Sequence, residues 1–279
     1  MDKTAPGGVY LCQVNENVSC GACCGLYNIP DLTREKLSGT LSERTEAFMK
    51  VPREIDAILE FGKNVLPEEK RKRPFPEFHH CPYIGLIGKG RTRPGCLLHP
   101  GSFGNNGVDY RGLGYYGSMT CNIYFCPSYT ELPVNYKRII RGSSQDWYSY
   151  GLIITETALI NAFLSETENR IGRKTEEADI CRNPDVASAV REFINLKITW
   201  PFRPQPSTPA NYFFKDRLYE KMKTDYAGIN HESVSSCHDT IFREFSSSFK
   251  SDEEVRKAGM IIESLWKRFE KGADNYGYC

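Results

Sequence analysis

The sequence predicts an α+β protein that is mainly helical, with an irregular, metal-stapled N-terminal half containing short strands and a helical C-terminal half. Eight of the eleven cysteines lie within the first 126 residues. Ten glycines fall between Gly85 and Gly117, which is typical of loops. After Pro133, apolar residues recur at three-, four- and seven-residue steps, as on amphipathic helices. We therefore expect a cysteine-rich metal or iron–sulfur-binding region at residues 1–130 and a helical region at 131–279, as two domains or one compact unit.

The first half is expected to contain two helices among its loops. One begins near Pro30, capped by Asp31 or Thr33, because Leu32, Leu37 and Leu41 are spaced along one face. The second covers Pro52–Gly62, with these apolar residues turned inward: Ile55, Ile58, Leu59 and Phe61. Short strands are expected at Val9–Leu11 and Ile123–Phe125.

The second half is expected to contain four helices. One runs from Trp147 to Asn169, and the next begins at Asn183, an N-cap followed by proline at the first helical position. A third helix lies near Tyr212–Tyr226. The last starts at a capping box of Ser251 and Glu254 and ends before Gly272. Its apolar stripe is Val255, Ala258, Ile262, Leu265 and Phe269.

Charge and hydropathy exclude several classes of partner. The formal net charge is +1, so no global field steers the protein toward nucleic acid. The basic run Lys70–Arg73 is short and flanked by Glu68 and Glu69, which favours a solvated loop. No apolar run approaches the roughly 18 residues needed to span a bilayer. We expect neither nucleic acid nor a membrane as partner; a protein partner would contact the helical half.

The cysteines indicate the compartment and its chemistry. Residues 1–20 carry no basic stretch followed by an apolar run, so we expect no secretory signal and a cytoplasmic protein. Thiols stay reduced there, and clustered cysteines then serve as metal ligands or redox groups more often than as disulfides. The odd total of eleven also argues against a fully paired disulfide framework.

The candidate metal ligands fall into two sets along the chain. Cys20 and Cys23 form a C-x-x-C pair, a spacing that lets two thiolates reach one metal from a tight turn. The adjacent Cys24 suits a polynuclear cluster or two neighbouring metals; alternatively, one of the vicinal pair is a ligand and the other is packed. The remaining candidates are Cys81, Cys96, Cys121 and Cys126, with Cys12 and His99 as further ligands.

Both zinc and iron–sulfur clusters fit these ligand types. Four thiolates hold zinc tetrahedrally, and four thiolates also hold a [2Fe–2S] or [4Fe–4S] cluster. The adjacent cysteines, and the prolines after Cys81 and Cys126, favour iron–sulfur. The alternative for each cysteine is a purely structural role as a buried free thiol, which packs like a small hydrophobic side chain. We assign Cys181, Cys237 and Cys279 to the core or the surface.

The order of these motifs resembles that of the YkgJ family, a zinc- or iron-chelating, or iron–sulfur, cysteine-cluster family. The motifs are Cys20-Gly-Ala-Cys-Cys, Cys81-Pro-Tyr-Ile, Arg93-Pro-Gly-Cys96 and Cys121-x4-Cys126, and the likeness covers about residues 12–128. The first cysteine of the family pattern falls at Asn17 here, so Cys12 substitutes for it or one ligand is absent. The resemblance implies a metal-chelating or iron–sulfur protein.

Two classes of function remain open. The first is a metal-binding module, because the dense cysteine set has no acid–base constellation beside it. The alternative is an enzyme that uses the cluster region, such as a methyl transferase or a redox protein, since similar cysteine clusters occur in flagellin lysine N-methylases. No methyl-donor binding motif supports the enzyme, so we favour the module.

Overall fold

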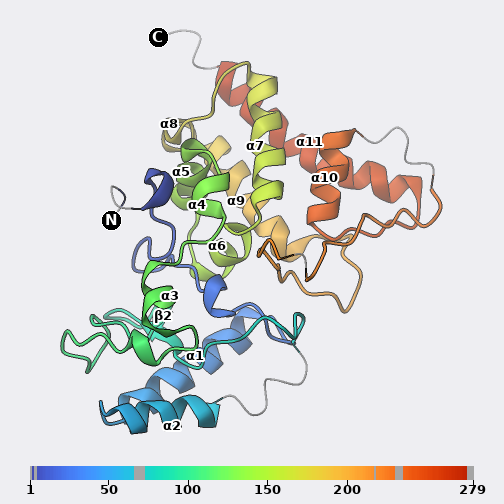
Figure 1. Cartoon of the computed structure of the whole chain (residues 1–279). Coiled ribbons are helices and arrows are strands. Elements are labelled where there is room, and N and C mark those ends of the chain that lie inside the picture. Colours follow the sequence, from blue (N-terminus) through green and yellow to red (C-terminus); the bar gives the residue numbers. More distant parts are fainter. Residues whose placement is uncertain (1, 3–4, 66–72, 217, 230–234, 275–279) are drawn as a thin grey trace.

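The computed structural model describes residues 2, 5–65, 73–216, 218–229 and 235–274. Helices dominate it, and its only named strands form one two-stranded sheet within these ranges, which confirms the mainly helical fold class. A helical body occupies the upper part of Figure 1, and a smaller unit with α1, α2, α3 and the sheet lies below it. None of the described helices is long and apolar enough to cross a membrane.

The lower unit is built from helices around a hairpin. Its elements are α1 (Arg34–Met49), α2 (Ile55–Val65), β1 (Ile84–Ile87), β2 (Arg93–Cys96) and α3 (Gly117–Ile123). Thr33 caps α1, accepting a hydrogen bond from the Lys36 amide at 3.2 Å, as the sequence predicts. The strands are antiparallel, with Ile84 opposite Cys96. This register places one candidate ligand at the end of the hairpin.

In the first half of the chain, the expected bounds of the second helix and both expected strands are wrong. The second helix begins at Ile55 instead of Pro52, and its Ile55 and Leu59 are 60% and 37% exposed, because only the face with Ile58 and Phe61 meets the core. The expected strand Ile123–Phe125 begins at the last residue of α3, and Val9–Leu11 forms no strand. The actual strands lie in the glycine-rich stretch, where the apolar run of β1 pairs with Arg93–Cys96 across a short turn.

The upper body packs its long helices around aromatic side chains. Its elements are α4 (Ser128–Glu131), α5 (Val134–Ser143), α6 (Trp147–Ile153), α7 (Thr157–Ile171), α8 (Glu177–Arg182), α9 (Pro184–Thr199), α10 (Ser236–Glu244) and α11 (Asp252–Asp274). Phe163 of α7 stacks on Phe193 of α9 at 3.9 Å between ring centroids and on Trp266 of α11 at 5.8 Å. The Asn183 cap of α9 is confirmed, with its side chain accepting from the Asp185 and Val186 amides.

The last helix follows its expected stripe more closely than its expected ends. Ala258, Ile262, Leu265 and Phe269 are buried, whereas Val255 is half-buried. Ser251 Oγ accepts from the Glu254 amide at 3.3 Å, but the Glu254 carboxylate accepts from the Lys250 amide instead of closing the box on Ser251. The helix continues past Gly272 to Asp274.

The single helix expected from Trp147 to Asn169 is interrupted at residues 154–156. Glu156 precedes α7, is 2% exposed, and pairs with Lys197 of α9 and with Lys221, the latter at 2.5 Å. A buried carboxylate needs charged partners. The chain therefore leaves the helical path where Glu156 turns into the interior.

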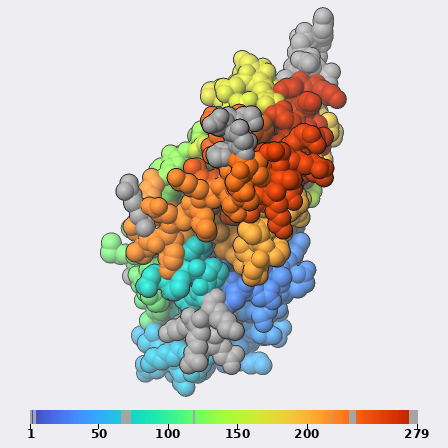
Figure 2. Space-filling view, turned by 90° about the vertical axis from the view of Figure 1, so that its right-hand side faces the viewer, coloured from blue at the N-terminus to red at the C-terminus, as the bar shows by residue number. Residues whose placement is uncertain are grey.

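The helix expected over Tyr212–Tyr226 is also wrong, because the described residues of this stretch are irregular. Their aromatic rings pack instead on the segment before Cys81. Phe75 lies 5.5 Å from Tyr212 and Phe78 lies 4.9 Å from Phe214, between ring centroids. Figure 2 shows this orange segment lying beside the cyan one. Aromatic contacts between segments far apart in the sequence therefore hold this stretch in an irregular conformation instead of a helix.

The N-terminal segment joins the upper body to the lower unit. Val9, Leu11 and Val18 belong to the core formed by the long helices, although they precede them by more than a hundred residues. The Leu11 amide donates to the Tyr129 hydroxyl and the Tyr150 hydroxyl donates to the Leu11 carbonyl, each at 2.8 Å. In Figure 1 this blue segment runs down from the helical body toward α1. A division of the chain near residue 130 stays a prediction.

Candidate metal centre

Four of the cysteines line the upper side of the junction between the two parts. Cys12, Cys20, Cys23 and Cys126, here called group one, all contact the core of the long helices. The Cys20 amide donates to the Cys12 carbonyl at 2.8 Å, and the Cys12 sulfur lies 3.2 Å from the Tyr129 hydroxyl. The Cys23 and Cys126 sulfurs also interact directly with each other. These contacts join three chain segments through sulfur and its immediate neighbours.

The other four cysteines lie on the lower side. Cys24, Cys81, Cys96 and Cys121 are called group two, and the first three contact a separate core that contains Phe48, Tyr83 and Leu98. The Cys81 amide donates to the Cys24 carbonyl at 2.8 Å. The Cys121 sulfur adjoins Gly114, which itself adjoins Leu98 of that core. Group two therefore joins the N-terminal segment to the hairpin and to α3.

A one-turn 3-10 helix, η3 (Ala22–Cys24), carries the vicinal pair at the boundary between the groups. Gly25 ends this turn in the left-handed conformation at φ 72°, and its amide donates to the Ala22 carbonyl at 2.8 Å. An added Cβ at Gly25 would overlap the carbonyl oxygen of His79. Glycine is therefore required both for the backbone angle and for the close approach of the segment before Cys81.

Backbone amides point at four of the sulfurs, two in each group. Each of the four accepts from the second residue after it: Ala22 for Cys20, Tyr83 for Cys81, Leu98 for Cys96 and Ser128 for Cys126. Cys81 also accepts from the Tyr115 amide. Two of these cysteines are followed by proline, which has no N–H, so the next amide is the first that can donate. Amide hydrogen bonds favour the charged thiolate over the thiol. The hydroxyls of Ser128 and Tyr129, which the sequence did not indicate, also contact sulfur, at Cys126 and Cys12 respectively.

Burial opposes thiolate formation at most of these positions. It raises the pKa of Cys12 and Cys81 to about 11 and that of Cys96 to about 12. Burial also raises the pKa of Cys24, and the neighbouring Cys81, Cys96 and Cys121 raise it further. Hydrogen bonds from Cys23 and Ser128 lower the pKa of Cys126. A set of buried thiols becomes anionic together only when a cation compensates their charge.

Each group has a route to solvent. An open groove of about 510 Å³ runs beside Cys126, lined on α3 by Met119 and Ile123. Cys121 of group two is itself exposed on α3. Met119 and Ile123 are 75% and 64% exposed, so α3 presents an apolar surface beside Cys126. A metal ion could reach either group without unfolding of a core.

In the part of the chain that the structure describes, no three His, Cys, Asp or Glu side chains stand in a ready-made metal-binding arrangement. His99 is exposed, and its Nδ1 accepts from the Gly101 amide at 3.0 Å. Its role as a ligand stays a prediction, as do those of the eight cysteines. His79 and His80 are buried beside Cys81, where His79 Nδ1 lies 2.7 Å from the Tyr116 hydroxyl.

Two cysteines lie apart from both groups within the described residues. Cys181 is exposed on α8, and Cys237 on α10 points at the Ala162 carbonyl at 3.5 Å. Cys279 lies outside the described residues, as do Lys70, Arg71 and Lys72 of the basic run. The expectation that Cys181 and Cys237 belong to surface or core is confirmed.

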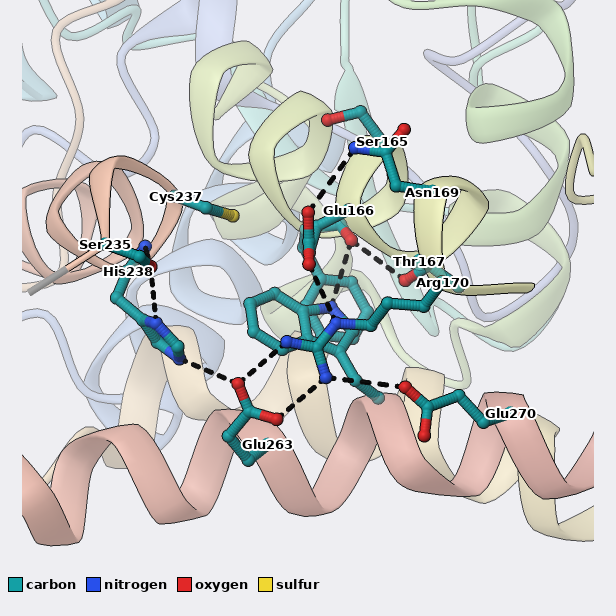
Figure 3. A network of polar contacts seen from close by, with 12 residues as sticks. Ser165, Glu166, Thr167, Asn169, Arg170, Ser235, Cys237, His238, Glu263 and Glu270 are labelled. Atoms are coloured by element: carbon teal, nitrogen blue, oxygen red, sulfur yellow. Dashed lines mark hydrogen bonds and ion pairs between the residues drawn. The ribbon is translucent and has the colours of Figure 1, made fainter. Parts of the chain in front are cut away.

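The residue after Cys237 belongs to a polar network centred on Arg170 (Figure 3). His238 Nδ1 lies 2.7 Å from Ser235 Oγ, and its Nε2 lies 3.3 Å from Glu263. Glu263 lies on α11. Ser235 caps α10, its Oγ accepting from the His238 amide at 3.3 Å. The arrangement therefore fixes the start of α10 against α11.

Arg170 is the centre of this network, and Arg170→Lys is expected to lower the free energy of unfolding by about 1–2 kcal/mol. The guanidinium contacts Glu166, Glu263 and Glu270 and lies 4.2 Å from the centroid of Trp266. Lysine keeps the charge but loses the forked hydrogen bonds and the flat stacking surface.

Urea denaturation followed by tryptophan fluorescence measures this loss. Arg268→Lys is the matched control, because Arg268 contacts Asp185 and Glu192 at the surface without an aromatic partner. Arg268→Lys should lower the free energy of unfolding by less than about 1 kcal/mol. Equal costs for the two variants would show that stacking on Trp266 contributes nothing.

Comparison of the chain with family models, curated proteins and solved structures found no match. The function is therefore inferred from the cysteines and their surroundings.

Proposed function

We propose that this protein binds an iron–sulfur cluster or zinc through its clustered cysteines. The observation that carries the proposal is the position of eight thiols, from six separate chain segments, on the two sides of one junction. Thiolates are the ligands that zinc and iron–sulfur clusters prefer. The resemblance of residues 12–128 to the YkgJ family points in the same direction.

The surroundings of the thiols support a bound cation. Uncompensated thiolates would be costly at these buried positions, and the amides that point at sulfur stabilise the charged form. Arg44 and Arg111 add positive charge near Cys81 and Cys96, respectively. Cysteine side chains would turn about χ1 to complete the ligand shell.

The bound metal ion or cluster would join the helical body to the lower unit. The N-terminal segment would be tied to the hairpin, to α3 and to the residues before α4. The proposal includes a reducing compartment such as the cytoplasm, where thiols remain available, and a protein partner on the helical half. Met260 on α11, 63% exposed, is one apolar side chain that such a partner could cover.

Metal analysis and an absorption spectrum of anaerobically purified protein test the proposal. A brown protein with iron and acid-labile sulfide identifies an iron–sulfur cluster, and a colourless protein with stoichiometric zinc identifies a zinc site. The variant with Cys23→Ser and Cys24→Ser is expected to lose at least half of the metal and to unfold at a lower denaturant concentration.

The control variant carries Cys181→Ser and Cys237→Ser, two cysteines outside both groups. It should keep the full metal content. A wild-type protein that contains no stoichiometric metal and takes up neither zinc nor iron and sulfide would refute the proposal. A Cys23→Ser, Cys24→Ser variant with full metal content would refute the assignment of these ligands.

A further inference from the structure

The turn that carries Cys23 and Cys24 directs their side chains away from each other. In a 3-10 helix, successive residues are rotated by about 120°, whereas residues three apart eclipse. Both members of the vicinal pair belong to η3, whereas Cys20 lies before it. The rotation within this turn therefore directs the Cys24 side chain away from that of Cys23.

The packing of the two thiols agrees with this geometry. Cys23 contacts the core of the long helices, together with Cys12, Cys20 and Cys126. Cys24 contacts the core of the hairpin, together with Cys81 and Cys96. Cys24 and Cys20 also contact a third core, which contains Leu26, Ile84 and Trp147. The adjacent Cys23 and Cys24 side chains therefore share none of the three cores.

Groups one and two contain the same kinds of cysteine. Group one has two cysteines in turns that receive an amide from the second following residue, Cys20 and Cys126, and group two has Cys81 and Cys96. Each group is completed by one member of the vicinal pair and one further thiol, Cys12 or Cys121. Four thiolates are the full protein ligand set of a closed zinc site or of one iron–sulfur cluster.

We propose that the eight cysteines form two separate four-sulfur centres, with Cys23 and Cys24 assigned to different ones. The first centre comprises Cys12, Cys20, Cys23 and Cys126, and the second comprises Cys24, Cys81, Cys96 and Cys121. Each binds one zinc ion or one iron–sulfur cluster. This inference rests on the proposed function, namely that the cysteines bind metal.

The two centres would join different pairs of chain segments. The first ties the N-terminal segment to the start of α4 in the helical body, and the second ties that segment to the hairpin and α3. Loss of one centre leaves the ligands of the other in place, because no cysteine is shared. Adjacent residues in the sequence therefore have separable roles.

Single and double substitutions test this division by counting metal per chain. Cys12→Ser and Cys96→Ser are each expected to halve the metal content of the wild type, measured by mass spectrometry of the native protein and by elemental analysis. Combining Cys12→Ser with Cys23→Ser should remove no more metal than either change alone. Combining Cys12→Ser with Cys24→Ser should remove all of it.

Several outcomes would overturn the two-centre inference while leaving metal binding intact. These are a wild type that holds a single metal centre, or a complete loss of metal in either single variant. A wild type that takes up no zinc, and no iron with sulfide, would instead defeat the proposed function itself. Cys181→Ser serves as the control and should keep both centres.

A second measurement on the unsubstituted chain covers the case in which variants fail to fold. X-ray absorption of the fully loaded protein should report four sulfur neighbours per zinc and no nearby second zinc. For iron–sulfur protein, iron and sulfide should amount to two clusters per chain. A zinc–zinc distance short enough for a bridging thiolate would contradict separate centres.

Discussion

Glu156→Gln is expected to lower the free energy of unfolding by about 3–5 kcal/mol, because it leaves a buried ammonium group without its counterion. The side chains of Glu156 and Lys197 are 1% and 2% exposed and form an ion pair. Glu156 also accepts from Lys221 at 2.5 Å, and Lys221 reaches Glu244 at 2.7 Å. Burial lowers the pKa of Lys197 to about 8 even with Glu156 present.

Chemical denaturation of the variant and of two companions measures this effect. Glu253→Gln removes one partner of an exposed pair with Lys257 and should cost less than about 0.5 kcal/mol. Adding Lys197→Met to Glu156→Gln should recover part of the loss, since it removes the stranded charge. If Glu156→Gln costs no more than Glu253→Gln, the buried pair does not stabilise the break between α6 and α7.

The second large effect is expected at the turn beside the cysteines. Gly25→Ala should cost about 2–5 kcal/mol, because the left-handed angle is unfavourable for alanine and the new Cβ would overlap the His79 carbonyl oxygen. The overlapped atom belongs to the backbone, so no side chain can rotate away. Relief requires moving Cys24 apart from Cys81, whose amide donates to the Cys24 carbonyl. We therefore expect metal loss from the second centre as well.

Two control substitutions at other glycines separate the effect of the backbone angle from that of the overlap with His79. Gly8 also has a φ of 72° but has open space around it, so Gly8→Ala should show only the backbone cost of about 1–2 kcal/mol. Gly39 lies within α1, and Gly39→Ala should stabilise the protein by about 0.5–1 kcal/mol. A Gly25→Ala variant as stable as Gly8→Ala would show that the contact with His79 is loosely packed.

Local signals in the sequence predicted much of the fold. The Thr33 and Asn183 caps and the apolar stripe of α11 depend on neighbours within a few residues, and all are present. The failures have distant causes. The helix from Trp147 is broken because Glu156 pairs with Lys197, which lies 41 residues later. Tyr212 and Phe214 pack on Phe75 and Phe78 instead of forming a helical stripe.

At the candidate site, too, the sequence did not predict what depends on contacts between distant residues. Sequence spacing identified the cysteines, but it left open whether Cys23 and Cys24 act together or apart. Their separation depends on which core each thiol meets, and residues far along the chain build those cores. The Cys-Pro pairs at Cys81 and Cys126 were the local clue to the amides, because proline leaves the second following residue as donor.

The N-terminal segment has a consequence for the timing of biosynthesis. Cys12 leaves the ribosome 114 residues before Cys126, which at roughly 5–20 residues per second is a delay of about 6–23 seconds. During that interval Cys12, Cys20 and Cys23 would lack the fourth ligand of the proposed first centre, and Val9 and Leu11 have no helices to pack against. Contacts of such long sequence separation also fold slowly. Newly made chains should therefore pass through a stage in which their thiols are open to oxidation or to the wrong metal, and cofactor loading should follow translation of Cys126.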